Sequence, residues 1–229
     1  METDRDNPKN LVRRSLQAQK VYSALNRLPF ITGSKKYCVT ISEERKFIWY
    51  RVAKVGTRTI YNTLREAGVP LSVGHASNIC VPSGYFGGYF KFAFVRNPFD
   101  RLVSCWLSKV VKKGKKIRFG ASEDSWKSMQ EFSGFIRFVE TLDLRNCDEH
   151  LRSQSSLIDL SNVDYIGRME NFSADANEIF NRIGVSVNEL KARNVSRSRT
   201  SYQDYYNADD IERVYRLYQK DFQIFGYSF

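Results

Sequence analysis

The sequence contains few of the residues that build metal sites, disulfide frameworks or membrane spans. Its 229 residues include two histidines and four cysteines, and no two cysteines form a C-x-x-C pair. A zinc site or disulfide scaffold is therefore not expected, and Cys38, Cys80, Cys105 and Cys147 are predicted to be reduced and largely buried. No stretch reaches the roughly 18 apolar residues of a membrane helix, and the N-terminus lacks a signal-peptide core. We expect a cytoplasmic location, or the Golgi lumen if an anchor is missing.

Positive charge is in clear excess. Lys and Arg number 36 against 25 Asp and Glu, a formal net charge of +11. This excess indicates an anionic partner, such as nucleic acid, an acidic polymer or a phosphorylated small molecule. With 42% hydrophobic residues the chain can build a core, and its length suits one domain. We therefore expect a single domain over residues 1–229, in which 1–35 form an arm or a loose helix.

Predicted strands and helices alternate along the chain. A hairpin is expected over 36–42 and 46–52, and the apolar, aromatic run 89–96 is typical of a buried central strand. A short strand is expected at 163–167. One predicted helix begins after Gly56. A second begins at Pro98, with Asn97 as its cap, and runs through Val110. Others cover 132–142 and end at Gly184, and the last runs to Phe222 with Asn207 as its cap. This order predicts an α/β fold with three layers, in which helices flank a central parallel sheet.

The segment 46–64 combines a strand, a short glycine-containing loop and the start of a helix. Backbone N–H groups and a helix N-terminus arranged in this way can bind a phosphate. The motif G-x-x-x-x-G-K-[ST] is absent because the lysine precedes the glycine, which disfavours an ordinary nucleotide triphosphatase. A plain strand-to-helix turn is the alternative. The candidate ligands in this loop are Lys54, Val55, Gly56, Thr57, Arg58 and Thr59.

A second candidate site lies in the segment 92–106, FAFVRNPFDRLVSCW. Arg96 ends the predicted strand, and Ser104 follows about two helical turns later. The residues expected away from the apolar face of this helix are Asp100, Arg101, Ser104 and Ser108. A guanidinium at the carboxyl end of a strand and a hydroxyl on the next helix can bind one phosphate together. The alternative is that Arg96 or Arg101 only pairs with Asp100 or another acid.

Taken together, the two segments resemble the nucleotide-binding signatures of sulfotransferases that use 3′-phosphoadenosine 5′-phosphosulfate (PAPS). The resemblance is to carbohydrate sulfotransferases of the chondroitin 4-O and heparan uronosyl 2-O kind and to their short bacterial relatives. It extends over residues 46–227 and is weakest at 107–145. Residues 148–158 resemble the family's H-W-x-P-Q segment, 164–172 its F-I-G-x-F-E-N segment, and 194–227 its C-terminal helix. The resemblance implies a P-loop-like sulfotransferase fold.

The resemblance also implies roles for individual residues. The lysine loop, Lys54 to Thr59, would hold the 5′-phosphosulfate, whereas Arg96 and Ser104 would hold the 3′-phosphate. A loop with Arg197 and Arg199 would close over that end of the donor. The sequence departs from the family at four positions, which are Ala53, Arg58, Leu151 and Ser153. The implied reaction is in-line transfer of the sulfuryl group to a hydroxyl, and the expected acceptor is a carbohydrate. Lys54 would stabilise the leaving phosphate, and no metal would be required.

Such a transfer needs a base for the acceptor hydroxyl, and histidine suits neutral pH. His75 and His150 are the two histidines. His75 is the first candidate, because the 2-O members and the short bacterial relatives carry a histidine there. His150 is the second, and an acid such as Glu66 the third. Otherwise His150 would be a surface residue among acids or would order the Gln154 segment.

The remaining features leave the acceptor open. Six of the ten residues 109–118 are Lys or Arg, which indicates either a solvated surface or a binding strip for an anionic glycan. A small molecule, a lipid or a tyrosyl peptide are the other possible acceptors. A basic nucleic-acid-binding protein is the alternative from another class, but no motif for it is present, and nucleic acid is not the expected partner. A kinase would need a Walker lysine and magnesium-binding carboxylates, which the sequence does not offer.

Overall fold

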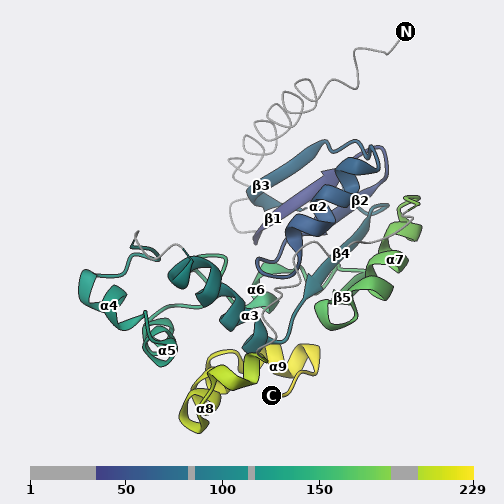
Figure 1. Ribbon diagram of the computed structural model, residues 1–229. Coiled ribbons are helices and arrows are strands. Elements are labelled where there is room, and N and C mark those ends of the chain that lie inside the picture. Colours follow the sequence, from purple (N-terminus) through teal and green to yellow (C-terminus); the bar gives the residue numbers. More distant parts are fainter. Residues whose placement is uncertain (1–34, 82–85, 113–116, 187–200) are drawn as a thin grey trace. The chain divides into compact units, whose positions relative to one another are not determined.

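The computed structural model describes residues 35–81, 86–112, 117–186 and 201–229 (Figure 1). The chain divides into two compact units. The sheet unit comprises residues 1–52, 56–94 and 157–193, and the helical unit comprises 53–55, 95–156 and 194–229. The organisation as one domain stays a prediction, and nearly all of the expected arm lies outside the described residues.

The sheet unit is built on a five-stranded sheet in the order β3-β1-β2-β4-β5. The strands are β1 (Lys36–Ser42), β2 (Phe47–Tyr50), β3 (Val73–Cys80), β4 (Phe90–Val95) and β5 (Tyr165–Arg168). β1 pairs antiparallel with both β2 and β3, whereas β2 pairs parallel with β4. The predicted α/β class and the hairpin are confirmed, but the sheet is mixed rather than parallel. The turn between β1 and β2 is too short for the crossover that a parallel pair requires.

The two parallel strands form the centre of the sheet because their sequences are almost continuously apolar. All four residues of β2 are fully buried, and Trp49 stacks on Phe92 of β4 with ring centroids 6.1 Å apart. Strands buried on both faces lose the usual alternation of polar and apolar residues. β3 was not predicted, because its sequence VGHASNIC contains few β-branched or aromatic residues.

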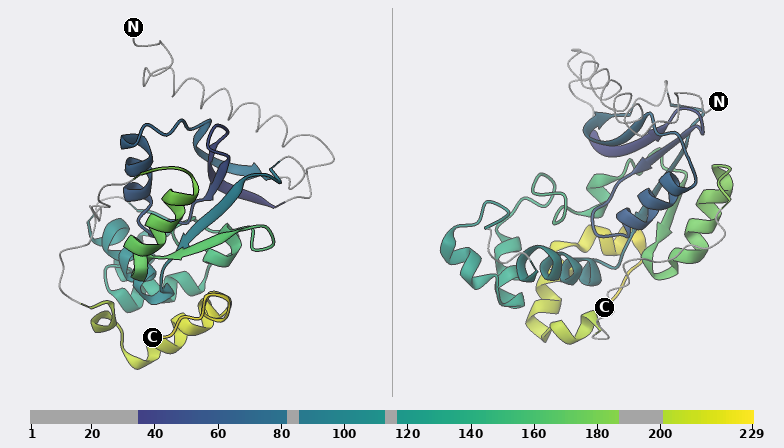
Figure 2. Two further views of the ribbon diagram at one scale, coloured as in Figure 1. Left: turned by 90° about the vertical axis from the view of Figure 1, so that its right-hand side faces the viewer. Right: turned by 45° about the horizontal axis from the view of Figure 1, so that its top comes forward.

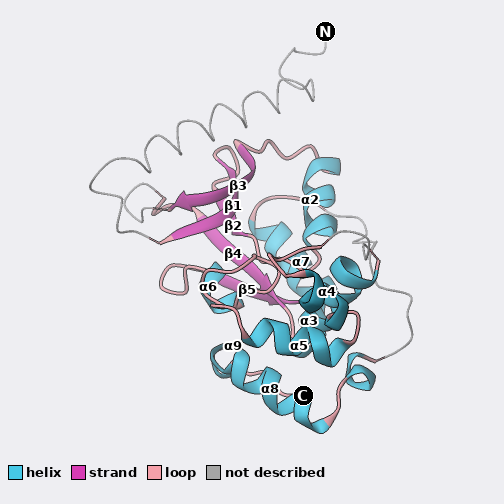
Figure 3. Cartoon of the chain, turned by 90° about the vertical axis from the view of Figure 1, so that its left-hand side faces the viewer, coloured by secondary structure: helices cyan, strands magenta, loops and turns pink. Residues whose placement is uncertain are grey.

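Two helices of the sheet unit, α2 (Thr57–Glu66) and α7 (Phe172–Arg182), lie on one side of the sheet (Figures 2 and 3). The 3₁₀ turn Met169–Asn171 leads into α7. α2 buries Ile60 and Leu64, and Phe172 at the start of α7 contacts Phe94 of β4. The described part of this unit thus shows two of the three predicted layers, which are the sheet and one layer of helices.

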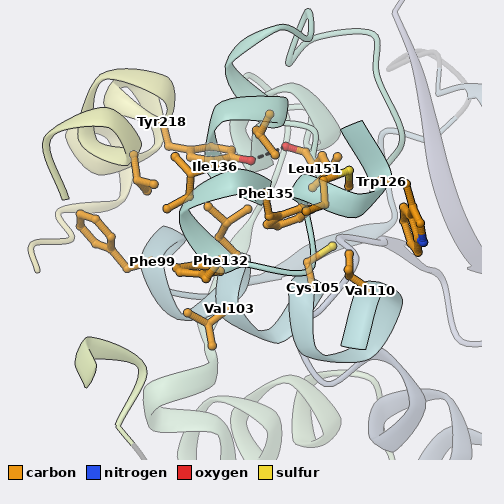
Figure 4. Close-up of a cluster of buried hydrophobic side chains, with 14 of the residues drawn as sticks. Phe99, Val103, Cys105, Val110, Trp126, Phe132, Phe135, Ile136, Leu151 and Tyr218 are labelled. Carbon is orange, nitrogen blue, oxygen red and sulfur yellow. Dashed lines mark hydrogen bonds between the residues drawn. The ribbon is translucent and has the colours of Figure 1, made fainter. Parts of the chain in front are cut away.

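The helical unit contains six α-helices in its described residues. These are α3 (Pro98–Trp106), α4 (Glu123–Ser128), α5 (Phe132–Glu140), α6 (Gln154–Leu157, the last residue belonging to the sheet unit), α8 (Ala208–Leu217) and α9 (Gln219–Phe225), with a π-helix at Leu107–Val111 and a 3₁₀ turn at Tyr202–Tyr205. Their apolar faces enclose one core that includes Phe99, Phe135 and Ile136 (Figure 4). Tyr218 is buried in this core and donates a hydrogen bond to the Leu151 carbonyl at 2.7 Å.

Helix starts in this unit match the sequence better than helix ends. Asn97 accepts a hydrogen bond from the Phe99 N–H and Asn207 one from the Asp210 N–H, so both predicted caps are confirmed. The helix that begins at Pro98 becomes a π-helix at Leu107, and the last predicted helix breaks at Tyr218. α4 and α6 were not predicted, because four to six residues are too few to show a helical period.

Candidate active site

The strongest local feature of the helical unit is the main chain at Lys54. Its φ is +72°, a left-handed conformation that costs a residue other than glycine about 1–2 kcal/mol. The Lys54 Nζ atom donates to Ser108 Oγ at 2.6 Å, and Ser108 Oγ in turn donates to the Cys105 carbonyl at 3.2 Å. The ammonium group is therefore held on the turn that follows α3.

Ser108 lies in the π-helix, whose wide turn is closed by a hydrogen bond from Lys112 N–H to the Leu107 carbonyl at 3.0 Å. Such turns insert one residue into a helix and frequently occur at functional sites. Sequence analysis placed Ser108 off the apolar face but gave it no role, because apolar periodicity does not reveal a π-turn. Ser108 is thus a site residue that the sequence analysis missed.

Arg96 brings the two sequence signatures into contact. Its Nη1 atom donates to the Lys54 carbonyl at 3.3 Å, although the two residues are 42 positions apart. Its Nε atom donates to Asp100 Oδ2 at 2.7 Å, so the alternative pairing considered for Arg96 is also present. The side chain is 22% exposed. Ser104 lies further along α3 and is half-buried.

A buried amide and a buried carboxylate hold the main chain of Arg96. The Gln154 side chain accepts from the Arg96 N–H at 3.0 Å and donates to the Arg96 carbonyl at 2.8 Å. Asp221, on α9, accepts from the N–H groups of Gln154 and Ser155 at 2.7 and 2.9 Å. Both Gln154 and Asp221 are fully buried. The sequence analysis mentioned the Gln154 segment but missed Asp221, whose only signal was an acid within the apolar stripe of the last helix.

His150 is also in the helical unit and is oriented by Asp148. Its Nδ1 atom lies 2.7 Å from Asp148 Oδ1, which also accepts from the His150 main-chain N–H at 2.9 Å. These contacts with His150 hold the pKa of Asp148 below its usual value. The ring then presents Nε2 as its second nitrogen, which is the arrangement required of a histidine base.

Lys54 and Asp148 both affect the buried thiol of Cys105. Burial raises the pKa of Cys105 to about 12, while the charge of Lys54 opposes this rise and the charge of Asp148 adds to it. The hydrogen bonds of Arg101 give the geometric link, because its side chain donates to the Ala53 carbonyl at 2.9 Å and to the Glu149 carbonyl at 3.0 Å. The residues next to Lys54 and His150 therefore contact the same side chain of the helical unit.

Val55 is buried and belongs to the helical unit, whereas the rest of the lysine loop, Gly56 to Thr59, belongs to the sheet unit. Gly56 is the N-cap of α2 with φ +72°, and a Cβ atom there would lie 2.9 Å from Met169 Sδ. Thr57 Oγ1 donates to the Val52 carbonyl at 2.9 Å, Thr59 is buried and Arg58 is exposed. The first turn of α2 has no acid and no side-chain cap. Its leading N–H groups therefore present positive partial charge, as an anion site requires.

The other predicted residues are more scattered. His75 lies on β3 and Glu66 in the last turn of α2, both exposed and both in the sheet unit. Arg197 and Arg199 lie outside the described residues, as do 113–116 of the basic segment. Within the described ranges, His, Cys, Asp and Glu side chains form no group of three or more that could hold a metal ion.

Comparison with curated proteins identifies a set of carbohydrate sulfotransferases. Carbohydrate sulfotransferase 11 of Rattus norvegicus is 26% identical over 166 residues, covering 61% of this chain and 47% of that protein. Carbohydrate sulfotransferase 10 of Danio rerio is 28% identical over 171 residues, with the same shares covered. Carbohydrate sulfotransferase 12 of Mus musculus is 28% identical over 169 residues, covering 61% and 40%. The chain spans about half the length of these relatives or less, and no solved structure matches it.

These relatives correct the expected location. The prediction of a cytoplasmic protein is wrong, because the similar proteins are animal carbohydrate sulfotransferases, a class that does not support it. The prediction rested on the lack of a long apolar segment, and such a lack does not assign a compartment. Among the described residues, none of the helices has the length and apolar character needed to cross a bilayer.

A family model described as the sulfotransferase family matches residues 81–228. This range contains Arg96, Ser104 and His150, together with the Gln154 and Asp221 side chains that support the main chain at Arg96. The match covers more than half of the chain, and the resemblance seen in the sequence motifs is thereby confirmed. The chain belongs to the sulfotransferase family.

Proposed function

We propose that this chain transfers the sulfuryl group of PAPS to a hydroxyl of a carbohydrate. Family membership and the names of the relatives support a sulfotransferase with an acceptor of this class. The observation that carries the proposal is the contact between Arg96 and the Lys54 carbonyl. This contact joins the side chain proposed for one end of the donor to the main chain of the residue proposed for the other end, which supports the proposal.

The proposed donor has phosphate groups at two positions, and each position is assigned its own ligands. Lys54 and the N–H groups at the start of α2 are the proposed ligands of the 5′-phosphosulfate, together with Val55, Gly56, Thr57, Arg58 and Thr59. Arg96 and Ser104 are the proposed ligands of the 3′-phosphate. The partly exposed pair of Arg96 with Asp100 contributes at most about 1 kcal/mol, so a doubly charged phosphate can compete for the guanidinium. Arg197 and Arg199 remain proposed ligands from outside the described residues.

The fold supports the same assignment. β2 leads through the lysine loop into α2, and the neighbouring strand β4 runs parallel to β2. Parallel neighbours of this kind bind ligands beyond their carboxyl ends, and Lys54 and Arg96 follow the carboxyl ends of β2 and β4. We therefore propose that the α/β fold is the P-loop-like sulfotransferase fold.

The donor supplies an activated sulfuryl group, and the chain provides charge and orientation. Negative charge grows on the bridging oxygen and on the departing 5′-phosphate as the bond breaks. The Lys54 ammonium is assigned to that oxygen, where one well-placed donor is worth about 3–4 kcal/mol. Its hydrogen bond to Ser108 keeps the ammonium aimed before the substrate binds, which reduces the cost of reorganisation.

The acceptor hydroxyl loses its proton to a base, for which we propose His150. The observation that favours it is the Asp148 contact at Nδ1, which fixes the ring and stabilises the imidazolium that forms. His75 is the second candidate and Glu66 the third. Lys109, whose charge helps to lower the pKa of Asp148, lies at the start of the basic segment 109–118. That segment is the proposed contact for an anionic glycan.

The donor assignment is tested by thermal stability with three nucleotides. Adenosine 3′,5′-bisphosphate is expected to raise the Tm far more than AMP or ADP, because only the first carries the 3′-phosphate that Arg96 and Ser104 would bind. Arg96→Ala should remove this preference, and Arg137→Ala on the exposed face of α5 is the matched control. Equal shifts with all three nucleotides would contradict the assignment.

The reaction is tested by transfer of radiolabelled sulfate from PAPS across an acceptor panel. The panel contains desulfated and partly sulfated glycans, small phenols, a lipid and a tyrosyl peptide, and mass spectrometry locates the ester. Labelled glycan is the expected product. Label only on a phenol, lipid or peptide would correct the acceptor, and no label on any acceptor would contradict the function.

A further inference from the structure

Arg101 is a buried cation that sequence analysis placed away from the apolar face of α3. Only 2% of the residue is exposed. Its Nε atom donates to the Ala53 carbonyl at 2.9 Å, and its two terminal nitrogens donate to the Arg152 carbonyl at 2.9 Å and the Glu149 carbonyl at 3.0 Å. Its three acceptors are therefore main-chain carbonyls from two segments about 100 residues apart.

Both segments carry a residue that the proposed reaction uses. Ala53 directly precedes Lys54, whose main chain is held at φ +72°. Glu149 and Arg152 lie on either side of His150 and Leu151. A guanidinium offers five N–H donors in one rigid plane, so a single side chain fixes the peptide before the lysine and the segment that carries the histidine.

We propose that Arg101 is a positioning residue that fixes the main chain beside Lys54 relative to the main chain beside His150. This inference rests on the proposed function, in which these two residues act on the leaving group and on the acceptor. Arg101 itself is buried and binds the main chain of the two segments, so the role proposed for it is indirect. A buried positive charge is costly, and the acceptors of Arg101 among the described residues are three carbonyls of these two segments. This arrangement indicates a role in the site rather than in a surface ion pair.

The charge of Arg101 reaches the same neighbourhood. It is among the charges that lower the pKa of Cys105, alongside that of Lys54. Lysine at position 101 would keep the charge but lose the planar fork, since an ammonium is a single point with a flexible stem. Arg101→Lys therefore separates the geometry of the guanidinium from its charge.

The test is a double-mutant cycle between Arg101→Lys and Lys54→Ala, with Arg137→Lys as the exposed control. Alone, Arg101→Lys should lower kcat by about 10-fold or more and change the Kd of adenosine 3′,5′-bisphosphate by less than about 3-fold. In the Lys54→Ala background it should lower kcat by no more than about 3-fold, because the cation it positions is gone and the residual effect passes through His150. A full 10-fold loss in both backgrounds would overturn the proposal.

Hydrogen exchange supplies a readout independent of turnover. In Arg101→Lys, amides in 53–55 and 149–152 should exchange faster. The amides of Gln154 and Ser155, held by Asp221, should keep their wild-type rates. Faster exchange throughout the helical unit would assign Arg101 a general structural role and overturn the proposal. If Arg101→Lys does not fold, Arg101→Gln is put to the same exchange measurement with the same two outcomes.

These results separate the inference from the function. If Lys54→Ala transfers sulfate at the wild-type rate, the proposed role of the lysine fails whatever Arg101 does. If Lys54→Ala is slow while Arg101→Lys acts equally in both backgrounds, only the positioning role fails.

Discussion

The helical unit and the sheet unit provide positive charge in different ways. In the helical unit the charge is on two long side chains, Lys54 and Arg96. Ser108 holds the Lys54 ammonium, and the buried amide of Gln154 holds the main chain of Arg96. In the sheet unit it comes from the main chain at the start of α2, where Gly56 has a positive φ. Side chains need supporting residues to be positioned, whereas a helix start needs only the right backbone. The two units should therefore respond differently to substitution.

The largest effect is expected at Lys54, whose ammonium is assigned to the departing oxygen. Lys54→Ala should lower kcat by about 10²–10³-fold, the loss found when one such donor is removed. The Tm should change little, because a loop lysine contributes little packing. Steady-state transfer assays and thermal melts check both expectations. Lys127→Ala, at a side chain that is 77% exposed, is the matched control and should leave kcat unchanged.

The next largest effect distinguishes the two histidines, one in each unit. His150→Ala should lower kcat by about 10²-fold, because a general base contributes at least that much. It should also change the pH profile of kcat, since the group proposed to take the proton of the acceptor hydroxyl is gone. His75→Ala should retain both the rate and its pH profile. The reverse pattern, measured over the same pH range, would make His75 the base.

The contrast between the units also explains which features the sequence predicts. Gly56 as a loop glycine, Asn97 and Asn207 as caps, and the apolar strands β2 and β4 are local signals, because each depends on a few adjacent residues. The supporting side chains depend on contacts between distant segments. Arg101 follows Asp100 on a helix and has the pattern of a surface residue, yet it binds carbonyls of residues 53, 149 and 152.

The strands show the same limit. The hairpin of β1 and β2 was predicted from its own residues, but β3 pairs with β1 only through tertiary contact and has no strong pattern of its own. The π-helix is likewise invisible in the apolar periodicity. The sequence alone revealed the pair of signatures, and the roles assigned to them stay predictions. The contact between them, and the residues that maintain it, required coordinates.

A substitution at Gly56 tests how strongly the sheet unit depends on the backbone conformation at the start of α2. Gly56→Ala should destabilise the protein by about 1–3 kcal/mol, because alanine is strained at φ +72° and its Cβ would lie 2.9 Å from Met169 Sδ. Chemical denaturation measures this loss. Gly68→Ala is the control, since its φ is +66° but nothing lies within 4 Å of the added Cβ. The strain is common to both variants, so the difference between them measures the steric contact alone.

Ser108 tests the side-chain contribution in the helical unit. Ser108→Ala removes the hydrogen bond to Lys54 without altering the charge, so kcat should fall by about 3–10-fold and the donor Kd should change less. Transfer assays and nucleotide titration give the two values. Ser128→Ala, at the end of α4, is the control. An unchanged kcat would mean that the Lys54 ammonium does not need Ser108 to reach the leaving oxygen.

The smallest effect concerns stability and pH at Asp148. Its contact with His150 lowers the pKa of the carboxyl, so the ionised form is favoured by folding. The resulting stabilisation is fully present above the ordinary carboxyl pKa of about 3.9 and disappears as the pH falls through the lowered value.

Because the side chain of Asp148 is 42% exposed, Asp148→Asn should cost less than about 1 kcal/mol at neutral pH. Urea titrations should show this difference at pH 5–7 and none near pH 2, whereas Asp124→Asn, at a side chain that is 97% exposed, should show a difference at neither. If the loss persists unchanged in acid, Asp148 stabilises the segment through packing, and His150 must be oriented by another group.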